Sequence, residues 1–187
     1  IPNWRSKSAL LLDRDGVINI DHGYVHSMKN FNWIKDAKET IKLANDLGIL
    51  LIVITNQSGI ARGFYTENEF KLFSEEINNQ LINFGAHVDA TYFCPHHPYE
   101  GIHKYRKFCD CRKPKVGMLE NAINEWGLNK ERCFLIGDKE SDILAAKNFG
   151  INSCKFSHEN ENLLEIFRKN LAYLKLTNYN SKLNNIS

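Results

Sequence analysis

Two carboxylates stand two residues apart, directly after an apolar run. Asp13 and Asp15 follow the run at 9–12, which has the composition of a buried strand. A turn at the end of such a strand would let both carboxylates reach one pocket, where they would repel each other unless a cation joined them. A hard, oxygen-binding ion such as Mg²⁺ meets that need, and Asp138 could complete its ligands because it follows another apolar run. The alternative is that Asp13 and Asp15 only cap a turn.

Groups that could bind a phosphate follow the ends of other apolar runs. Thr55 offers a hydroxyl and Asn56 an amide. The loop at 57–59, Gln-Ser-Gly, could turn backbone N–H groups toward an anion. Positive charge comes from Arg112, Lys113 and Lys139. Each of these side chains alone is more commonly a solvated surface residue, so it is their gathering at strand ends that indicates a site.

Three of the five cysteines lie within eighteen residues and form a Cys-x-His and a Cys-x-Cys pair. The four side chains of the two pairs are Cys94, His96, Cys109 and Cys111. They suit a tetrahedral, structural Zn²⁺ site in a loop at 94–111. His97 and His103 are spare candidates, and thiols that merely cluster are the alternative. Cys133 and Cys154 lie in apolar runs, where we expect small buried hydrophobic residues.

The elements that must position these groups alternate along the chain. Apolar, β-rich runs predict strands at 9–12, 49–54, 88–93 and 133–136, with a weaker one at 151–156. Amphipathic patterns predict helices between them, over 34–47, from Thr66 to Gly85, from Pro114 to Gly127 and over 141–149, and a last one over 163–174. Thr66 with Glu69 has the spacing of a capping box. Alternating strands and helices predict an α/β fold, a doubly wound, Rossmann-like three-layer sandwich around a parallel sheet.

Length and composition limit the classes of protein that fit. The 187 residues carry a formal charge of +2 with no long run of like charge, so a dedicated nucleic-acid binder is not expected. The longest apolar stretch, at 49–54, is too short to span a membrane, and we expect a cytoplasmic protein. We expect one domain over 1–176, without a separate cap domain, and a flexible tail at 177–187 rich in Asn and Ser. A monomer is expected. A zinc-stabilised binding module is the alternative from another class of function.

The order of these motifs resembles that of the haloacid-dehalogenase-like phosphohydrolases. The four motifs of that superfamily are matched here by Asp13-Arg14-Asp15-Gly16, by Thr55-Asn56, by Lys113, and by Gly137-Asp138 with Asp142. The resemblance implies that Asp13 is a nucleophile that forms an aspartyl-phosphate and that Asp15 is a general acid and base. It also implies that Mg²⁺ is held by the Asp13 side chain, the Asp15 backbone carbonyl and Asp138.

Other residues receive roles from the same resemblance. Thr55 and Lys113 would bind oxygens of the transferring phosphoryl group. Asp142 would orient Lys139 or a metal-bound water rather than bind the metal. The zinc site would hold Arg112 and Lys113 over the catalytic aspartates, because Cys111 directly precedes them.

The zinc loop resembles one subfamily, which contains the heptose bisphosphate phosphatases and the histidinol-phosphate phosphatases. The runs at 12–26, 55–63 and 94–98 are similar to the heptose enzymes in particular, and the resemblance spans about 11–150. It implies a Mg²⁺-dependent enzyme that removes the 7-phosphate of a small sugar bisphosphate, with histidinol-phosphate phosphatase as the alternative. The residues implied to bind the sugar are Asp21, His22, Gly23, Tyr24, Asn56, Gln57 and Ser58. Arg112 would hold the distal phosphate.

Overall fold

A computed structural model describes residues 7–174 of the chain. The tail predicted at 177–187 therefore lies outside the described residues. Five parallel strands form one sheet in the order β3-β2-β1-β4-β5. They are β1 (Lys7–Leu12), β2 (Leu50–Asn56), β3 (Ala90–Cys94), β4 (Leu128–Gly137) and β5 (Asn152–Lys155). The predicted doubly wound α/β fold is confirmed, and the long connections within 7–174 are loops rather than a separate cap domain.

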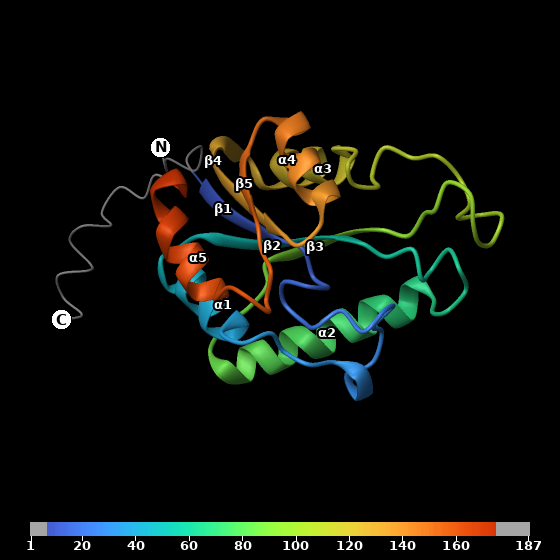
Figure 1. Ribbon diagram of the computed structural model, residues 1–187, viewed down its shortest axis with the longest axis horizontal. Coiled ribbons are helices and arrows are strands. Elements are labelled where there is room, and N and C mark those ends of the chain that lie inside the picture. The colour runs from blue at the N-terminus through green and yellow to red at the C-terminus, as the bar shows by residue number, and fades with distance from the viewer. Residues whose placement is uncertain (1–6, 175–187) are drawn as a thin grey trace.

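Helices cover both faces of the sheet. They are α1 (Ala37–Asp46), α2 (Glu67–Phe84), α3 (Gly117–Trp126), α4 (Glu140–Phe149) and α5 (Leu163–Asn170), with short 3₁₀ turns at Met28–Asn30 and Leu171–Leu174. In Figure 1, α1, α2 and α5 lie on one face and α3 and α4 on the other. Thr66 caps α2 through the predicted capping box, since its Oγ1 accepts a hydrogen bond from the Glu69 backbone N–H at 3.1 Å. Within the described residues, no helix is long and apolar enough to cross a membrane.

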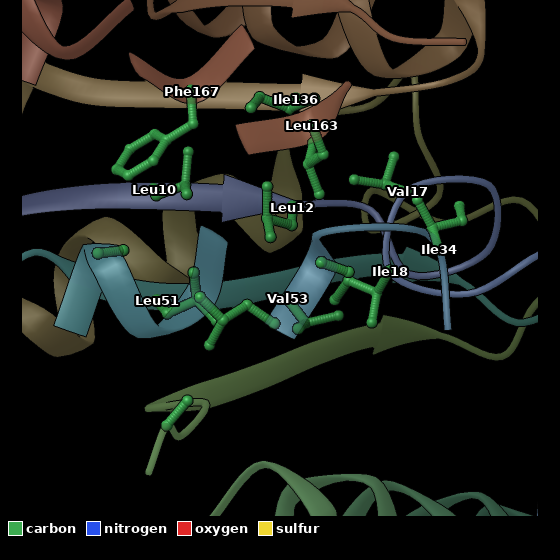
Figure 2. Close-up of a cluster of buried hydrophobic side chains, with 14 of the residues drawn as sticks. Leu10, Leu12, Val17, Ile18, Ile34, Leu51, Val53, Ile136, Leu163 and Phe167 are labelled. Carbon is green, nitrogen blue, oxygen red and sulfur yellow. The ribbon is translucent and has the colours of Figure 1, made fainter. Parts of the chain in front are cut away.

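The sheet separates two apolar cores. Leu10 and Leu12 of β1 point into the core under α1, α2 and α5, whereas Ala9 and Leu11 point into the core under α3 and α4. Figure 2 shows Leu10 and Leu12 beside Phe167 and Leu163 of the first core. Side chains of a strand alternate between the two faces, so a strand buried on both sides is apolar at every position.

Several predicted elements differ in extent from the structure, the first helix and β4 among them. The first helix was expected to include Ile34, but α1 begins at Ala37, after Asp36 in a left-handed conformation (φ 61°). Ile34 contributes to the core from the preceding loop, where its N–H donates to the Ile18 carbonyl at 2.9 Å. β4 begins at Leu128 rather than at residue 133. Leu128 is buried and pairs with Lys7 of β1, whereas the polar residues 129–132 lie within a register shift before Cys133 pairs with Ala9. The backbone pairing, rather than a continuous apolar pattern, therefore extends the strand to Leu128.

The carboxyl ends of the central strands lie at one edge of the sheet. Leu12 pairs in register with Val53 of β2 and with Ile136 of β4. Asp13 therefore comes level with the last residues of both neighbouring strands. The loops that follow β2 and β3 project from this same end (Figure 1). The predicted site residues are brought together here by the topology of the sheet.

Candidate active site

Asp13 is the centre of a buried charged cluster. It is 6% exposed, and its Oδ1 lies 3.1 Å from the Nζ of Lys113, which is itself 4% exposed. The same ammonium lies 2.5 Å from Asp142 Oδ1 and donates to the Ile54 carbonyl at 2.8 Å. Lys113 thus connects the ends of β1 and β2 to the first turn of α4.

Three carboxylates in this cluster could hold a metal ion. Oxygens of Asp13, Asp138 and Asp142 all lie within 4.8 Å of one another. The Oδ1 atom of Asp138 is buried and has no hydrogen-bond partner among the described residues. Gly16 allows Asp138 to come this close, because a Cβ on Gly16 would lie 2.2 Å from Asp138 Oδ2. An orphaned buried carboxylate oxygen beside two other carboxylates fits a hard cation such as Mg²⁺.

The charges of the cluster also favour a bound cation. Burial raises the pKa of Asp13 to about 7, against the lowering effect of Lys113, and the neighbouring carboxylates add to the rise. The pKa of Asp138 is raised as well, chiefly by burial. Burial lowers the pKa of Lys113, but Asp13 and Asp142 outweigh it and the net change is upward. Lys113 is the one ammonium among the described residues that contacts these carboxylates directly, and Lys139 lowers the pKa of Asp138 without preventing its net rise. A bound cation would restore the ionised form of Asp13.

Asp15 faces a different set of partners. Arg14 Nη2 donates to its two carboxylate oxygens at 2.9 and 3.0 Å, Asn19 Nδ2 donates to Oδ1 at 3.0 Å, and Gln57 Nε2 donates to Oδ2 at 3.0 Å. The side chain of Asp15 is not one of the three carboxylates grouped around the candidate metal position. The sequence did not indicate that Arg14 and Asn19 hold Asp15, because their contacts depend on how the loop after β1 folds back.

Thr55 and Asn56, at the end of β2, hold the loops around the cluster. Thr55 is buried, and its Oγ1 accepts a hydrogen bond from Gln57 Nε2 at 2.9 Å. The amide of Asn56 bridges to the backbone of Lys113, with its Nδ2 donating to the carbonyl at 3.2 Å and its Oδ1 accepting from the N–H at 3.1 Å. Two hydrogen bonds therefore link Asn56, at the end of β2, to Lys113, in the segment after β3.

A polar pocket of about 440 Å³ opens beside Asp15. Of the residues singled out in the sequence, it is lined by Asp15, Asp21, Gly23, Tyr24, Asn56, Gln57, Ser58, Arg112, Lys113 and Lys139. Tyr65 and Ser141 also line it, and no motif had indicated them. His22 is not among the lining residues, since its ring Nε2 faces Asn32 Oδ1 at 2.9 Å in the same loop.

The side chains of Lys139 and Asp142 contact other groups rather than each other. The Lys139 Nζ lies 3.2 Å from Asp21 Oδ2 across the pocket. Asp142 contacts the Lys139 backbone N–H, which donates to its Oδ2 at 3.0 Å, and it contacts the side chain of Lys113 rather than that of Lys139. Asp142 therefore orients Lys113 directly, which the motif pattern had not indicated.

The predicted zinc ligands converge. Cys94 Sγ lies 3.6 Å from Cys109 Sγ and 3.0 Å from Cys111 Sγ, and His96 Nδ1 lies 3.3 Å from Cys111 Sγ. None of the cysteines is in a disulfide. Three sulfurs and one imidazole nitrogen within 4.8 Å of one another could hold a tetrahedral metal ion. The spare candidates His97 and His103 are not part of this group.

The loop at 94–111, which carries the cysteine and histidine cluster, packs on the loop that follows β2. The Ile102 N–H donates to the Ala61 carbonyl at 2.7 Å, and Arg62 contacts the carboxylate of Glu100. Gly101 (φ 101°) allows this approach, because a Cβ there would lie 2.0 Å from the Ala61 oxygen. The Arg62 guanidinium also lies 5.6 Å from the ring centre of Tyr24, which lines the pocket. The cysteine and histidine cluster and the pocket wall thus belong to one continuous structure.

Known proteins share both this fold and this chemistry. A family model described as HAD-hydrolase-like matches residues 110–160. The structure of a HAD-like phosphatase from Mesorhizobium loti superposes with a TM-score of 0.77 at 29% identity, covering 89% of this chain and 87% of that one. The D,D-heptose 1,7-bisphosphate phosphatase from B. bronchiseptica, solved with magnesium and phosphate, superposes with a TM-score of 0.72 at 25% identity, covering 88% and 98%. The fold and site define a phosphatase of the haloacid-dehalogenase-like superfamily.

Curated relatives narrow this class to one family. A D-glycero-β-D-manno-heptose-1,7-bisphosphate 7-phosphatase from Haemophilus ducreyi is 43% identical over 148 residues, which is 79% of this chain and 81% of that protein. The protein of the same name from Pasteurella multocida is 41% identical over 168 residues, covering 90% and 91%. The chain belongs to the family of D-glycero-β-D-manno-heptose-1,7-bisphosphate 7-phosphatases. The resemblance read from the motifs is confirmed, and the histidinol-phosphate phosphatase alternative is not favoured.

Proposed function

We propose that this protein removes the 7-phosphate of D-glycero-β-D-manno-heptose 1,7-bisphosphate, a phosphoric monoester hydrolysis. The observation that carries the proposal is the buried cluster of Asp13, Lys113, Asp138 and Asp142 beside a polar pocket of about 440 Å³. Family membership supports the substrate, since curated relatives about 40% identical bear that name. Their names specify the β anomer, which motif spacing alone could not indicate.

The reaction uses two carboxylates in succession. A carboxylate oxygen of Asp13 attacks phosphorus and the bond to the sugar O7 breaks, giving an aspartyl-phosphate. Asp15 gives its proton to the departing alkoxide, and it then takes a proton from the water that attacks the aspartyl-phosphate and releases inorganic phosphate. Mg²⁺, when bound by the carboxylates of Asp13 and Asp138 and the backbone carbonyl of Asp15, supplies positive charge that lets an anionic nucleophile approach an anionic phosphate.

The remaining polar groups bind and orient the substrate. Lys113 and Thr55 bind oxygens of the transferring phosphoryl group, and Asp142 orients Lys113 through the 2.5 Å contact with its ammonium. Arg112 and Lys139 line the pocket and would bind the distal phosphate. Among the hydrogen-bonding groups that would contact the sugar hydroxyls are Asp21, His22, Gly23, Tyr24, Asn56, Gln57 and Ser58. His22 would have to leave Asn32 to take part.

The cysteine cluster would hold a structural Zn²⁺ in this proposal. The ligand chemistry supports zinc, since three sulfurs with one imidazole fill a tetrahedral site and leave no open position for substrate. Arg112 Nη1 donates to the His96 carbonyl at 3.3 Å, so the cluster directly supports a pocket-lining cation. Besides its metal ions and water, the proposed reaction requires a small-molecule sugar bisphosphate as its binding partner. A monomer, a cytoplasmic location and a single domain over 1–176 remain predictions.

Phosphate release tests the proposal directly. We expect Mg²⁺-dependent release from the β anomer of heptose 1,7-bisphosphate to be faster than from the α anomer or from histidinol phosphate, and to stop with EDTA. Asp13→Asn should lose turnover because an amide cannot act as the nucleophile. Faster turnover of histidinol phosphate would overturn the substrate, and full activity after complete removal of Mg²⁺ would overturn the mechanism.

A further inference from the structure

Arg14 stands between Asp13 and Asp15 in the sequence, and its side chain is a buried cation. Its side chain is 3% exposed, and its guanidinium carbon lies 5.7 Å from the ring centre of Phe70 and 5.3 Å from that of Phe73, both on α2. Burying a cation is costly unless charged or hydrogen-bonding partners compensate it. The positions of those partners therefore indicate what the cation does.

The polar contacts of the Arg14 guanidinium are concentrated on one nitrogen. Nη2 lies 2.9 and 3.0 Å from the two carboxylate oxygens of Asp15 and 2.5 Å from the Val25 carbonyl. Its two hydrogens thus serve the carboxylate and the carbonyl. Nε and Nη1 are buried and have no hydrogen-bond partner among the described residues. Asp15 is therefore the counter-ion of this cation, and Val25 is its second anchor.

Val25 follows the segment of the loop that reaches the pocket. Asp21, Gly23 and Tyr24 line the pocket just before it, and Val25 itself is buried in the core. Tyr24 has a positive φ of 51°, an unfavourable conformation that needs support from its surroundings. One nitrogen of Arg14 consequently fixes both the carboxylate of Asp15 and the end of the loop that faces the substrate.

We infer that Arg14 is a positioning residue for the leaving-group side of the reaction. It holds the Asp15 carboxylate against the pocket wall and locks the loop at 19–25 in the same geometry, so that the proton on Asp15 meets the departing oxygen. Asn19 and Gln57 also donate to Asp15, but both are neutral amides. The inference rests on the proposed function, in which Asp15 is the general acid.

Two substrates with different leaving groups test this role. The leaving group of an alkyl phosphate is an alkoxide, which must be protonated. The leaving group of p-nitrophenyl phosphate is a stabilised phenolate anion, which needs no proton. In single turnovers that isolate formation of the aspartyl-phosphate, we expect Arg14→Lys to slow the release of the heptose product about 100-fold and the release of p-nitrophenolate less than about threefold. Asp15→Asn should show the same selective loss and sets the scale. Equal losses on both substrates would mean a merely structural role and would overturn the inference.

A measurement of stability covers the case in which a variant is inactive or folds poorly. The double-mutant cycle of Arg14→Met and Asp15→Asn, followed by denaturant unfolding, should be strongly non-additive, because each single change leaves a buried charge without its partner. Additive effects would overturn the inference. A wild-type protein that releases phosphate from neither substrate would overturn the proposed function instead, and the cycle would then decide the pairing of Arg14 with Asp15 by itself.

Discussion

Asp13, Asp138 and Asp142 bring three carboxylates into a space where Lys113 supplies one positive charge. In water each carboxyl would ionise near its ordinary pKa, but burial and mutual repulsion oppose ionisation here. The pKa of Asp13 therefore rises to about 7 in the metal-free protein. In the proposed mechanism the same residue must be ionised to act as a nucleophile, so the site would need a cation to reach its reactive state.

The raised pKa of Asp13 predicts how the stability of the metal-free protein depends on pH. The pKa of Asp13 is raised from 3.8 to about 7. At a pH between these two values, the folded protein therefore holds a proton on Asp13 that the unfolded chain lacks. Stability should rise as the pH falls through 7, and lowering the pH from 8 to 6 should add about 1 kcal/mol to the free energy of unfolding. Urea unfolding in EDTA at the two pH values measures the difference.

Asp13→Asn is the matched control for that measurement. The amide does not titrate, so the variant should be more stable than the wild type at pH 8. The rise in the free energy of unfolding between pH 8 and pH 6 should be mostly absent in the variant. Excess Mg²⁺ should likewise stabilise the wild type more at pH 8 than at pH 6. A wild-type protein whose metal-free stability falls between pH 8 and pH 6 would contradict the raised pKa.

Residues at strand ends could be predicted from the sequence, whereas their partners could not. Asp13, Thr55 and Asp138 each follow an apolar run, and parallel strands of one sheet must end at the same edge. The contacts of Arg14 with Asp15 and of Asp142 with Lys113 depend on loop conformation and helix placement. No periodic pattern encodes those contacts, so only the folded structure reveals them.

At the scale of elements, the loop after β3 is the part whose order we expect to depend most on the proposed zinc ion. It joins Cys94, at the end of β3, to the Cys109 and Cys111 pair before α3. Its contacts with the loop after β2 include the hydrogen bond from Ile102 to Ala61. Closing a long polar loop at its base reduces its conformational freedom.

Cys109→Ala tests the role of the zinc loop. We expect the variant to lose bound zinc and to raise KM for the bisphosphate about tenfold, because Arg112 would no longer be held beside the pocket, while kcat changes less. Metal analysis and steady-state kinetics measure both effects. Cys154→Ala is the control, since Cys154 lies in β5, outside the cluster. Unchanged zinc content and unchanged kinetics in Cys109→Ala would contradict the proposed site.

The boundaries of elements show where sequence patterns stop being informative. Thr66 and Glu69 predicted the start of α2 correctly, because a capping box is a local arrangement of hydrogen bonds. Ile34 was wrongly placed on the first helix because a core-facing loop residue and a core-facing helix residue are equally apolar. The part of β4 before Cys133 was missed because residues 129–132 are polar and the pairing of Leu128 with Lys7 of β1 is a long-range contact.

At the scale of the whole molecule, the two cores and the site occupy separate regions. The core under α1, α2 and α5 and the core under α3 and α4 lie on the two faces of the sheet. The charged cluster lies at the carboxyl edge between them. Stability and chemistry are therefore expected to respond to different substitutions, apart from the buried charges themselves.

Phe167→Ala tests that separation. Phe167 is fully buried, and Figure 2 shows it beside Leu10 of β1 rather than at the strand end that leads to Asp13. Its truncation should lower the free energy of unfolding by about 3–5 kcal/mol, a large part of a typical domain's stability. Because Phe167 packs in the core under α1, α2 and α5 and is not part of the charged cluster, kcat well below the melting temperature should stay close to that of the wild type.

Leu72→Ala is the matched control, since Leu72 lies on α2 with 56% of its surface exposed and alanine keeps the helix favourable. Its free energy of unfolding should change by less than about 0.5 kcal/mol. Denaturant unfolding and phosphate release at saturating substrate, measured on the same preparations, separate the two quantities. A Phe167→Ala protein that remains folded but loses most of its kcat would show that the core under α5 sets the geometry of the charged cluster, and would contradict this separation.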